Sequence, residues 1–130
     1  MQPEEISPEL LEKYGETVVE ILLDGKTISD QELHNIWKAD FYMITAANPY
    51  SQLLPESENE IRNQQLLEHL LLQVAEVLPA IGRDPLGSWM EKGWVLQVRD
   101  ENQLIDIAKQ FEQNAIFKFT AHGKEVIDCL

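Results

Sequence analysis

Three asparagines stand where a polar side chain must find a partner inside the fold. Asn48 follows the uncharged segment 41–47, and Ser51 comes three residues later. Asn59 and Asn63 lie one turn apart on a leucine-rich helical segment, on the side that its leucines bury. An unpaired buried carboxamide costs about 1–3 kcal/mol. Two interpretations stay open: these amides brace the backbone of the loop after the segment, or they form the polar floor of a ligand pocket.

A second group of chemically useful residues surrounds a turn rich in Gly and Pro. Arg83 and Asp84 begin this turn, and Trp89 and Glu91 follow it. A carboxyl group beside an indole can have a raised pKa and act as a general acid or base. In the alternative interpretation, Arg83 and Glu91 pair across two strands, as opposite charges often do.

Gln113 and Asn114 follow the last expected helix. Asparagine tolerates the left-handed conformation that commonly ends a helix, so Asn114 is expected in that conformation. Alternatively, the two amides complete the pocket of Asn48 and Asn63.

Several kinds of chemistry lack their sequence signals. Ser51 is not in the G-x-S-x-G turn that exposes a hydrolase nucleophile. His34, His69 and His122 lie in separate elements without metal-ligand spacing, and the chain has no glycine-rich run to cradle a phosphate. We therefore expect no metal and no cofactor, and the lack of a recognisable catalytic motif favours a protein that is not an enzyme.

Charge is the strongest feature of the composition. Twenty-three acidic side chains oppose ten basic ones, so the formal net charge is −13. A negative field repels phosphate backbones, so nucleic-acid binding is not expected. The same field keeps a small protein soluble, and it also suits a basic protein partner.

The single cysteine and the N-terminal residues bear on the cellular compartment. Cys129 has no intramolecular disulfide partner and is expected to be a small buried hydrophobe. Residues 1–10 show neither the basic nor the apolar region of a signal peptide. No aliphatic run is longer than that of residues 70–72, far short of the roughly 20 residues of a membrane span. We expect a cytoplasmic protein without a membrane segment.

Helix-start and turn signals divide the chain into alternating helices and strands. Gly93 lies inside an expected strand and predicts a bulge or a close approach of the backbone. The expected elements, in chain order, are a helix from residue 8 ended by Gly15, strand 17–23, a helix opened by Ser29, strand 41–47, a helix opened by Ser57, strands 77–81 and 89–98, a helix opened by Asp100, and strands 115–120 and 125–129.

This order of elements predicts an α+β fold in one domain, residues 1–130. The stretch 41–120 has the β-α-β-β-α-β order of a ferredoxin-like, split βαβ unit. We expect a mixed or antiparallel sheet with helices mainly on one face. An N-terminal α-β-α extension and an additional C-terminal strand complete the expected fold.

Four segments, taken in order, are similar to one known family. They are Ile44-Thr45-Ala46-Ala47-Asn48-Pro49; Glu58-Asn59 with Asn63; Gly82-Arg83-Asp84-Pro85 with Gly87, Trp89 and Glu91; and Gln113-Asn114-Ala115-Ile116-Phe117. On these segments the chain resembles, over roughly residues 10–128, the bacterial family known as domain of unknown function 3293. Glu112 stands where that family usually has Gly, and Lys92-Gly93 stands where it often has Pro. The resemblance implies a shared fold and no particular activity.

The candidate residues are expected at one edge of the sheet. Strands 41–47 and 77–81 should run in the same direction, so their carboxyl ends share that edge, and strand 89–98 starts there. Gln113 joins them only if strand 115–120 runs antiparallel to strand 41–47. The sequence thus predicts a pocket for a small polar ligand; the alternative is an acidic interaction or regulatory module without a ligand site. The candidate ligand-binding residues are Asn48, Ser51, Asn59, Asn63, Arg83, Asp84, Trp89, Glu91 and Gln113.

Overall fold

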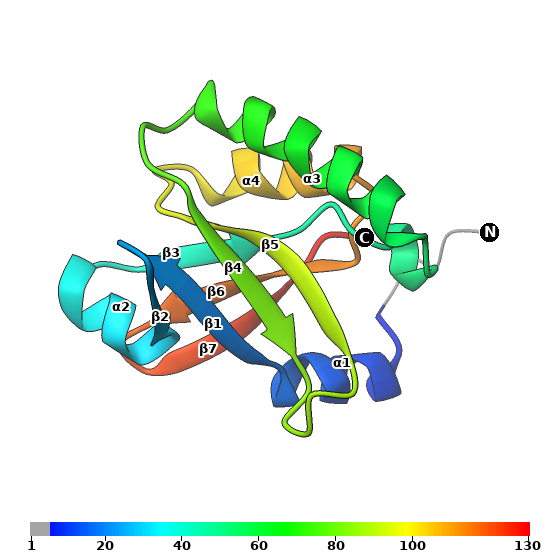
Figure 1. The fold of residues 1–130 in the computed structure, drawn as a ribbon, viewed down its shortest axis with the longest axis horizontal. Coiled ribbons are helices and arrows are strands. Elements are labelled where there is room, and N and C mark those ends of the chain that lie inside the picture. The colour runs from blue at the N-terminus through cyan, green and yellow to red at the C-terminus, as the bar shows by residue number, and fades with distance from the viewer. Residues whose placement is uncertain (1–5) are drawn as a thin grey trace.

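A computed structural model describes residues 6–130 of the chain (Figure 1). Its elements, in chain order, are α1 (Pro8–Glu16), β1 (Val18–Leu23), β2 (Lys26–Ser29), α2 (Asp30–Trp37), β3 (Phe41–Ile44), the 3₁₀ turn η1 (Pro49–Ser51), α3 (Glu56–Leu71), β4 (Leu78–Arg83), β5 (Met90–Leu96), α4 (Glu101–Gln110), β6 (Ala115–Thr120) and β7 (Gly123–Asp128).

The strands form one sheet in the order β2-β1-β4-β5-β3-β6-β7. Neighbouring strands are antiparallel throughout, so the expected α+β class is confirmed and the sheet is antiparallel, not mixed. β3 and β4 run in the same direction on either side of β5. The sheet continues beyond these strands into β1 and β2 on one side and into β6 and β7 on the other.

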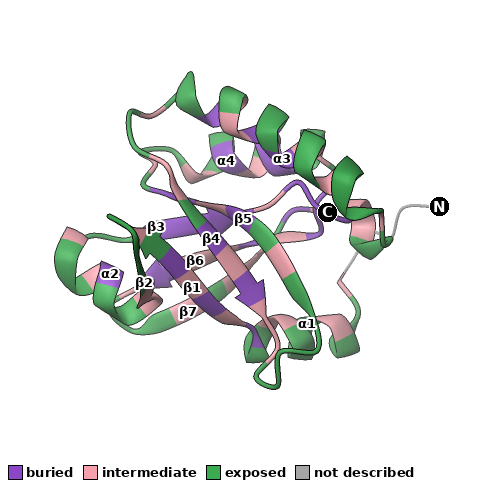
Figure 2. Cartoon of the chain, viewed as in Figure 1, coloured by how far each residue is buried: buried purple, intermediate pink, exposed green. Residues whose placement is uncertain are grey.

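Two hydrophobic cores lie on the two faces of the sheet. On one face, Leu66 of α3 and Leu104 of α4 belong to the same buried cluster as Ile44 of β3. On the other face, Phe41 stacks on Phe119 with a ring-centroid distance of 4.8 Å. All four residues of β3 are buried, which explains why this strand carries no charge (Figure 2).

The helices divide between the two faces of the sheet. α3 and α4 cover one face (Figure 1), whereas α1 packs against β7, and α2 packs against β1, β2 and β6. The expectation that the helices lie mainly on one face is therefore correct only for α3 and α4. The reason is the second apolar face, which Phe41 and Phe119 share and which needs its own cover.

The N-terminal extension contains a strand that the sequence pattern did not predict. β2 pairs with β1 across a turn at Asp24 and Gly25, whose φ angles of 52° and 78° are typical of a type I′ hairpin. β2 has four residues, and none is fully buried, so it lacks a recognisable apolar alternation. The extension is therefore α-β-β-α, and the expected α-β-α order is wrong.

Helix ends agree with the capping signals in part. Ser29 Oγ accepts from the Glu32 N–H at 3.1 Å and the Ser29 N–H donates to the Glu32 carboxylate, which completes a capping box. α1 continues through Gly15, because a helical glycine costs only about 1 kcal/mol. α3 begins at Glu56 directly after Pro55, whose fixed φ suits a helix start, and not behind a serine cap.

Candidate functional site

A pocket of about 580 Å³ opens beside α1, at the end of the sheet where β3 ends and β5 begins. Its walls come from α1, the loop after β3, the β4–β5 hairpin and the start of β6. β6 runs antiparallel to β3, which is the condition for Gln113 to reach this edge. Six of the nine candidate residues line the pocket: Asn48, Ser51, Asp84, Trp89, Glu91 and Gln113.

Glu91 contributes a carboxylate to the wall of this pocket. It lies near the start of β5, opposite Gly82 of β4, and it is half-buried in the pocket wall. Its Oε2 accepts a hydrogen bond from Asn48 Nδ2 at 3.0 Å. Burial raises the pKa of Glu91, and the hydrogen bond from Asn48 opposes this rise. In residues 6–130, no Lys, Arg or His forms an ion pair with its carboxylate.

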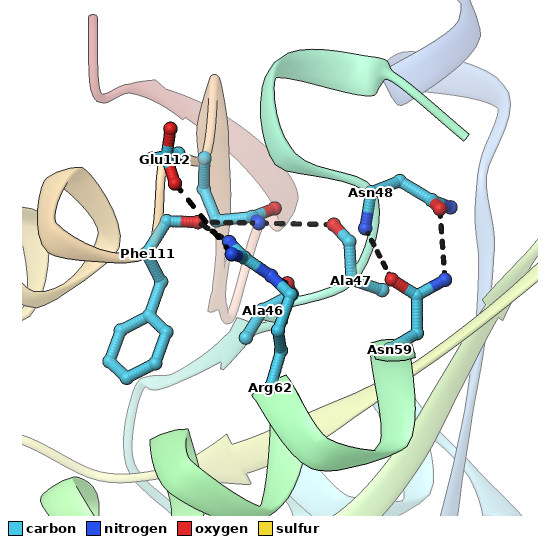
Figure 3. A network of polar contacts seen from close by, with 8 residues as sticks. Ala46, Ala47, Asn48, Asn59, Arg62, Phe111 and Glu112 are labelled. Carbon is cyan, nitrogen blue, oxygen red and sulfur yellow. Dashed lines mark hydrogen bonds and ion pairs between the residues drawn. The ribbon is translucent and has the colours of Figure 1, made fainter. Parts of the chain in front are cut away.

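Asn48 positions both Glu91 and the loop that follows β3. Its φ of 49° is left-handed, a conformation that Asn adopts more readily than most residues. Its Oδ1 accepts from the Leu54 N–H at 3.0 Å and from Asn59 Nδ2 at 2.9 Å, while its own N–H donates to Asn59 Oδ1 (Figure 3). Asn59 therefore braces the loop, whereas Asn48 both braces it and faces the pocket.

Ser51, Tyr14 and Asn114 form a polar cluster in the same pocket. Asn114 Nδ2 donates to Ser51 Oγ at 2.8 Å and to the Tyr14 hydroxyl at 3.4 Å. Asn114 is 4% exposed, and its Oδ1 is buried without a hydrogen-bond donor among the described residues. Burial also raises the pKa of Tyr14. The sequence did not predict Tyr14 as a pocket residue. Nothing in the pattern of the first helix indicates that the Tyr14 hydroxyl contacts Asn114, which lies 100 positions later in the sequence.

Arg62 (Figure 3) and Gln113 both brace backbone carbonyls behind the pocket. Arg62 Nε donates to the Ala46 carbonyl and Arg62 Nη2 to the Phe111 carbonyl, both at 2.6 Å. Gln113 Nε2 donates to the Ala47 carbonyl at 3.0 Å and also to that of Phe111. These contacts fix a segment that was expected to be strand but that leaves the sheet after Ile44. No sequence signal indicates this role for Arg62, because it lies on a helix among other polar residues.

Asn63 lies on the other face of the sheet from the pocket. Its Oδ1 accepts from the Ala46 N–H at 2.8 Å, and its Nδ2 donates to the Lys92 carbonyl at 3.1 Å. It lines a separate groove of about 500 Å³ together with Lys92 and Trp94. Successive residues of a strand point to opposite faces, so Glu91 faces the pocket while Lys92 faces this groove. Asn63 is therefore a backbone brace and not part of the pocket floor.

Arg83 and Asp84 are neighbours in the sequence, but only Asp84 lines the pocket. Arg83 Nε donates to Glu20 Oε1 of β1, so the alternative interpretation, in which Arg83 pairs with Glu91, is wrong. Asp84 Oδ1 accepts from the Trp89 N–H at 2.9 Å, and its Oδ2 accepts from the Ser88 hydroxyl at 2.6 Å. These donors lower the pKa of Asp84. Asp84 thus fixes the hairpin turn that presents Trp89 and Glu91.

Glu112, not Asn114, takes the left-handed conformation after α4. Its φ is 59°, at the position where the resemblance predicts Gly, which adopts such angles without strain. The Glu112 carbonyl accepts from the Tyr50 N–H at 2.7 Å, and its carboxylate lies 3.6 Å from Arg62. The turn therefore keeps its conformation with Glu, and it joins the end of α4 to η1.

Two further properties concern the described part of the chain as a whole. Within residues 6–130, no three His, Cys, Asp or Glu side chains gather closely enough to hold a metal ion. None of the helices in this range has the length and the apolar composition needed to cross a bilayer.

Comparison with known families assigns the chain to one of them. The model of the family described as "Protein of unknown function (DUF3293)" matches residues 44–116, more than half of the chain, and the chain belongs to this family. The matched range begins at the end of β3 and ends in β6, so it contains Asn48, Glu91 and Gln113. Neither a curated protein nor a solved structure matches the chain significantly.

Proposed function

We propose that this protein binds a small polar molecule in the pocket beside α1. The observation that carries the proposal is the concentration of unfavourable features around one cavity. Asn48, Tyr50 and Ser51 all have positive φ angles, and each such residue costs on the order of 1–3 kcal/mol. Glu91 is half-buried without an ion pair in the described chain, and Asn114 Oδ1 lacks a donor there. Conformational strain and unpaired polar groups cluster where a ligand completes the interactions.

The polar groups that would contact the ligand come from three segments. The loop after β3 provides Ser51, β5 provides Glu91, and α1 provides the hydroxyl of Tyr14. Trp89 is 36% exposed and forms part of the wall. Such a mixture of aromatic wall and few polar groups is typical of a small-molecule site.

Binding without catalysis fits these groups best. The Ser51 hydroxyl oxygen accepts from an amide, Asn114 Nδ2. In the part of the chain that the structure describes, no histidine or carboxylate forms a hydrogen bond with Ser51 that could activate it as a nucleophile. Glu91 is the pocket carboxylate whose pKa is raised by burial, and one carboxylate suffices to anchor a ligand.

The alternative, an acidic module for a basic partner, has weaker support. Glu20, Glu101 and Glu112 lie beside Arg83, Lys118 and Arg62 of the same chain. These three carboxylates are already paired within the chain, so they are less available to a basic partner. The pocket is therefore the better-supported proposal.

A ligand screen with a filled-pocket variant tests the proposal. Wild-type protein and Ala115→Leu, which places extra volume at a pocket residue, are melted with amino acids, nucleosides, sugars and amines. We expect at least one class to raise the Tm of wild type and not of Ala115→Leu, since a ligand at 100 times its Kd adds about 2.7 kcal/mol of stability. Equal shifts in both proteins, or no shift with any class, would contradict the proposal.

A further inference from the structure

We propose that the ligand of this pocket carries a cationic nitrogen, a primary ammonium or a guanidinium group, which binds the carboxylate of Glu91. This inference rests on the proposed function and names the chemical class of its ligand. It depends on three properties of the pocket: which charges line it, which of them are already engaged, and what surrounds Glu91.

The charged groups of the pocket are predominantly acidic. Glu16, Asp84 and Glu91 line it, against the single lysine Lys13. Asp84 is engaged, because it accepts from the Ser88 hydroxyl and the Trp89 N–H. Glu91 accepts one hydrogen bond, at Oε2 from Asn48, and its Oε1 accepts none from the described residues. One carboxylate oxygen therefore remains available for a donor that the ligand brings.

Lys124, a half-buried lysine held against α1, is not available to neutralise Glu91. Lys124 Nζ donates to the carbonyls of Tyr14 and Thr17, at 2.7 and 2.5 Å. It also lies 4.6 Å from the centre of the Phe117 ring. Lys124 is thus held behind α1 by carbonyls and a ring face, and it forms no ion pair with Glu91.

The surroundings of Glu91 favour a cation over a neutral or anionic ligand. Tyr14 and Trp89 place aromatic rings in the same pocket, and ring faces attract ammonium and guanidinium groups. A half-buried carboxylate has lost part of its hydration, and a charged donor restores more of that loss than a neutral donor does. An anionic ligand would add a like charge beside Glu91. A guanidinium or ammonium group therefore satisfies the carboxylate and the rings together.

Four probes of similar size test this inference by amide NMR on the whole chain. They are n-butylammonium, n-butylguanidinium, n-butanol and butyrate. We expect the two cations to shift the signals of Ser51, Trp89, Glu91 and Asn114, and butyrate to leave them unchanged. Glu91→Gln should weaken cation binding about tenfold, the effect of removing one charge-assisted hydrogen bond. Glu76→Gln is the matched control, because Glu76 is exposed and does not line the pocket.

The outcomes separate this inference from the proposed function. Stronger binding of butanol or butyrate than of the cations at the pocket signals would overturn the cationic class, while a pocket that binds small molecules would remain. Equal affinity of the cations for wild type and Glu91→Gln would also overturn it. Shifts confined to residues outside the pocket would overturn the cation site, and the Ala115→Leu screen would then decide separately whether the pocket binds any other ligand.

Discussion

Asn48 and Glu91 are joined by a hydrogen bond of 3.0 Å between Nδ2 and Oε2, across 43 positions of sequence. The contact links two of the segments on which the chain resembles its family, one ending β3 and one beginning β5. Asn48 also accepts from the backbone of Leu54 and from Asn59. The carboxylate in the pocket is therefore positioned by the same side chain that orders the loop beside it.

Replacing Glu91 by Gln should stabilise the ligand-free protein. Burial raises the pKa of Glu91, so its ionised form disfavours the folded state. The stability that this group contributes is fully present below the ordinary Glu pKa, and it is lost as the pH rises through the raised folded value. Gln can still accept from Asn48 but does not titrate.

Thermal melts of both proteins between about pH 4 and pH 8 measure this effect. The Tm of Glu91→Gln minus that of wild type should increase as the pH rises. The difference removes contributions from other carboxyl groups, such as Asp84, whose pKa is lowered. A variant that is less stable than wild type near neutral pH would identify Glu91 as a structural residue.

Replacing Asn48 by Ala should destabilise the protein by about 2–4 kcal/mol. Three hydrogen bonds of the side chain are lost, and the groups of Leu54, Asn59 and Glu91 lose a partner. Alanine also adopts the left-handed φ less readily than Asn. Urea unfolding measures the change. Asn35→Ala, at an exposed position of α2, is the control and should stay within about 0.5 kcal/mol of wild type.

Adding a methyl group at Gly93 should destabilise the sheet by about 1–3 kcal/mol. A Cβ there would lie 2.7 Å from the Ile44 carbonyl oxygen and 3.2 Å from Thr45 Cβ. Gly93 pairs in regular register with Ala80, so it marks a close approach and not a bulge. Gly15→Ala is the control, because a Cβ at Gly15 meets nothing within 4 Å. Chemical denaturation showing equal stability for Gly93→Ala and Gly15→Ala would contradict this account.

Local signals in the sequence predicted the elements whose ends depend on local contacts. The Ser29 capping box and the uncharged β3 are examples, because each depends on neighbouring residues or on burial of a whole strand. The sequence did not predict β2, because its four residues take the strand conformation by pairing with β1 and do not bury an apolar face. Short edge strands depend on tertiary pairing more than on propensity.

The pocket was predictable to the level of a sheet edge, but not to the level of a face. Arg83 and Asn63 lie at the expected end of the sheet, yet they contact Glu20 and the Lys92 backbone outside the pocket. A shift of one position along a strand reverses the face, and the sequence does not specify which residue points inward. The position of Tyr14 in the pocket could not be predicted, because α1 is held in place by residues far away in the sequence. One example is Lys124, which donates to the Tyr14 carbonyl.

Cys129 should react very slowly with a thiol reagent in the folded protein. The side chain is 1% exposed, and burial raises the pKa of its thiol to about 12. Only the thiolate attacks, and a pKa higher by three units lowers its fraction about a thousandfold. Reaction with a chromogenic disulfide should be fast in urea and nearly absent in buffer. Rapid modification of the native protein would show that the C-terminal residues open readily.

Replacing Glu112 by Gly should stabilise the protein relative to Glu112→Ala by about 1 kcal/mol. Both variants remove the carboxylate that lies 3.6 Å from Arg62, and both keep the carbonyl that accepts from the Tyr50 N–H. They differ in the cost of the left-handed φ of 59°, which a Cβ makes unfavourable and Gly tolerates. Gly also gains freedom in the unfolded chain, which offsets part of the relief. Urea unfolding of the two variants measures the balance, and an Ala variant as stable as the Gly variant would show that the turn after α4 relaxes away from the left-handed conformation.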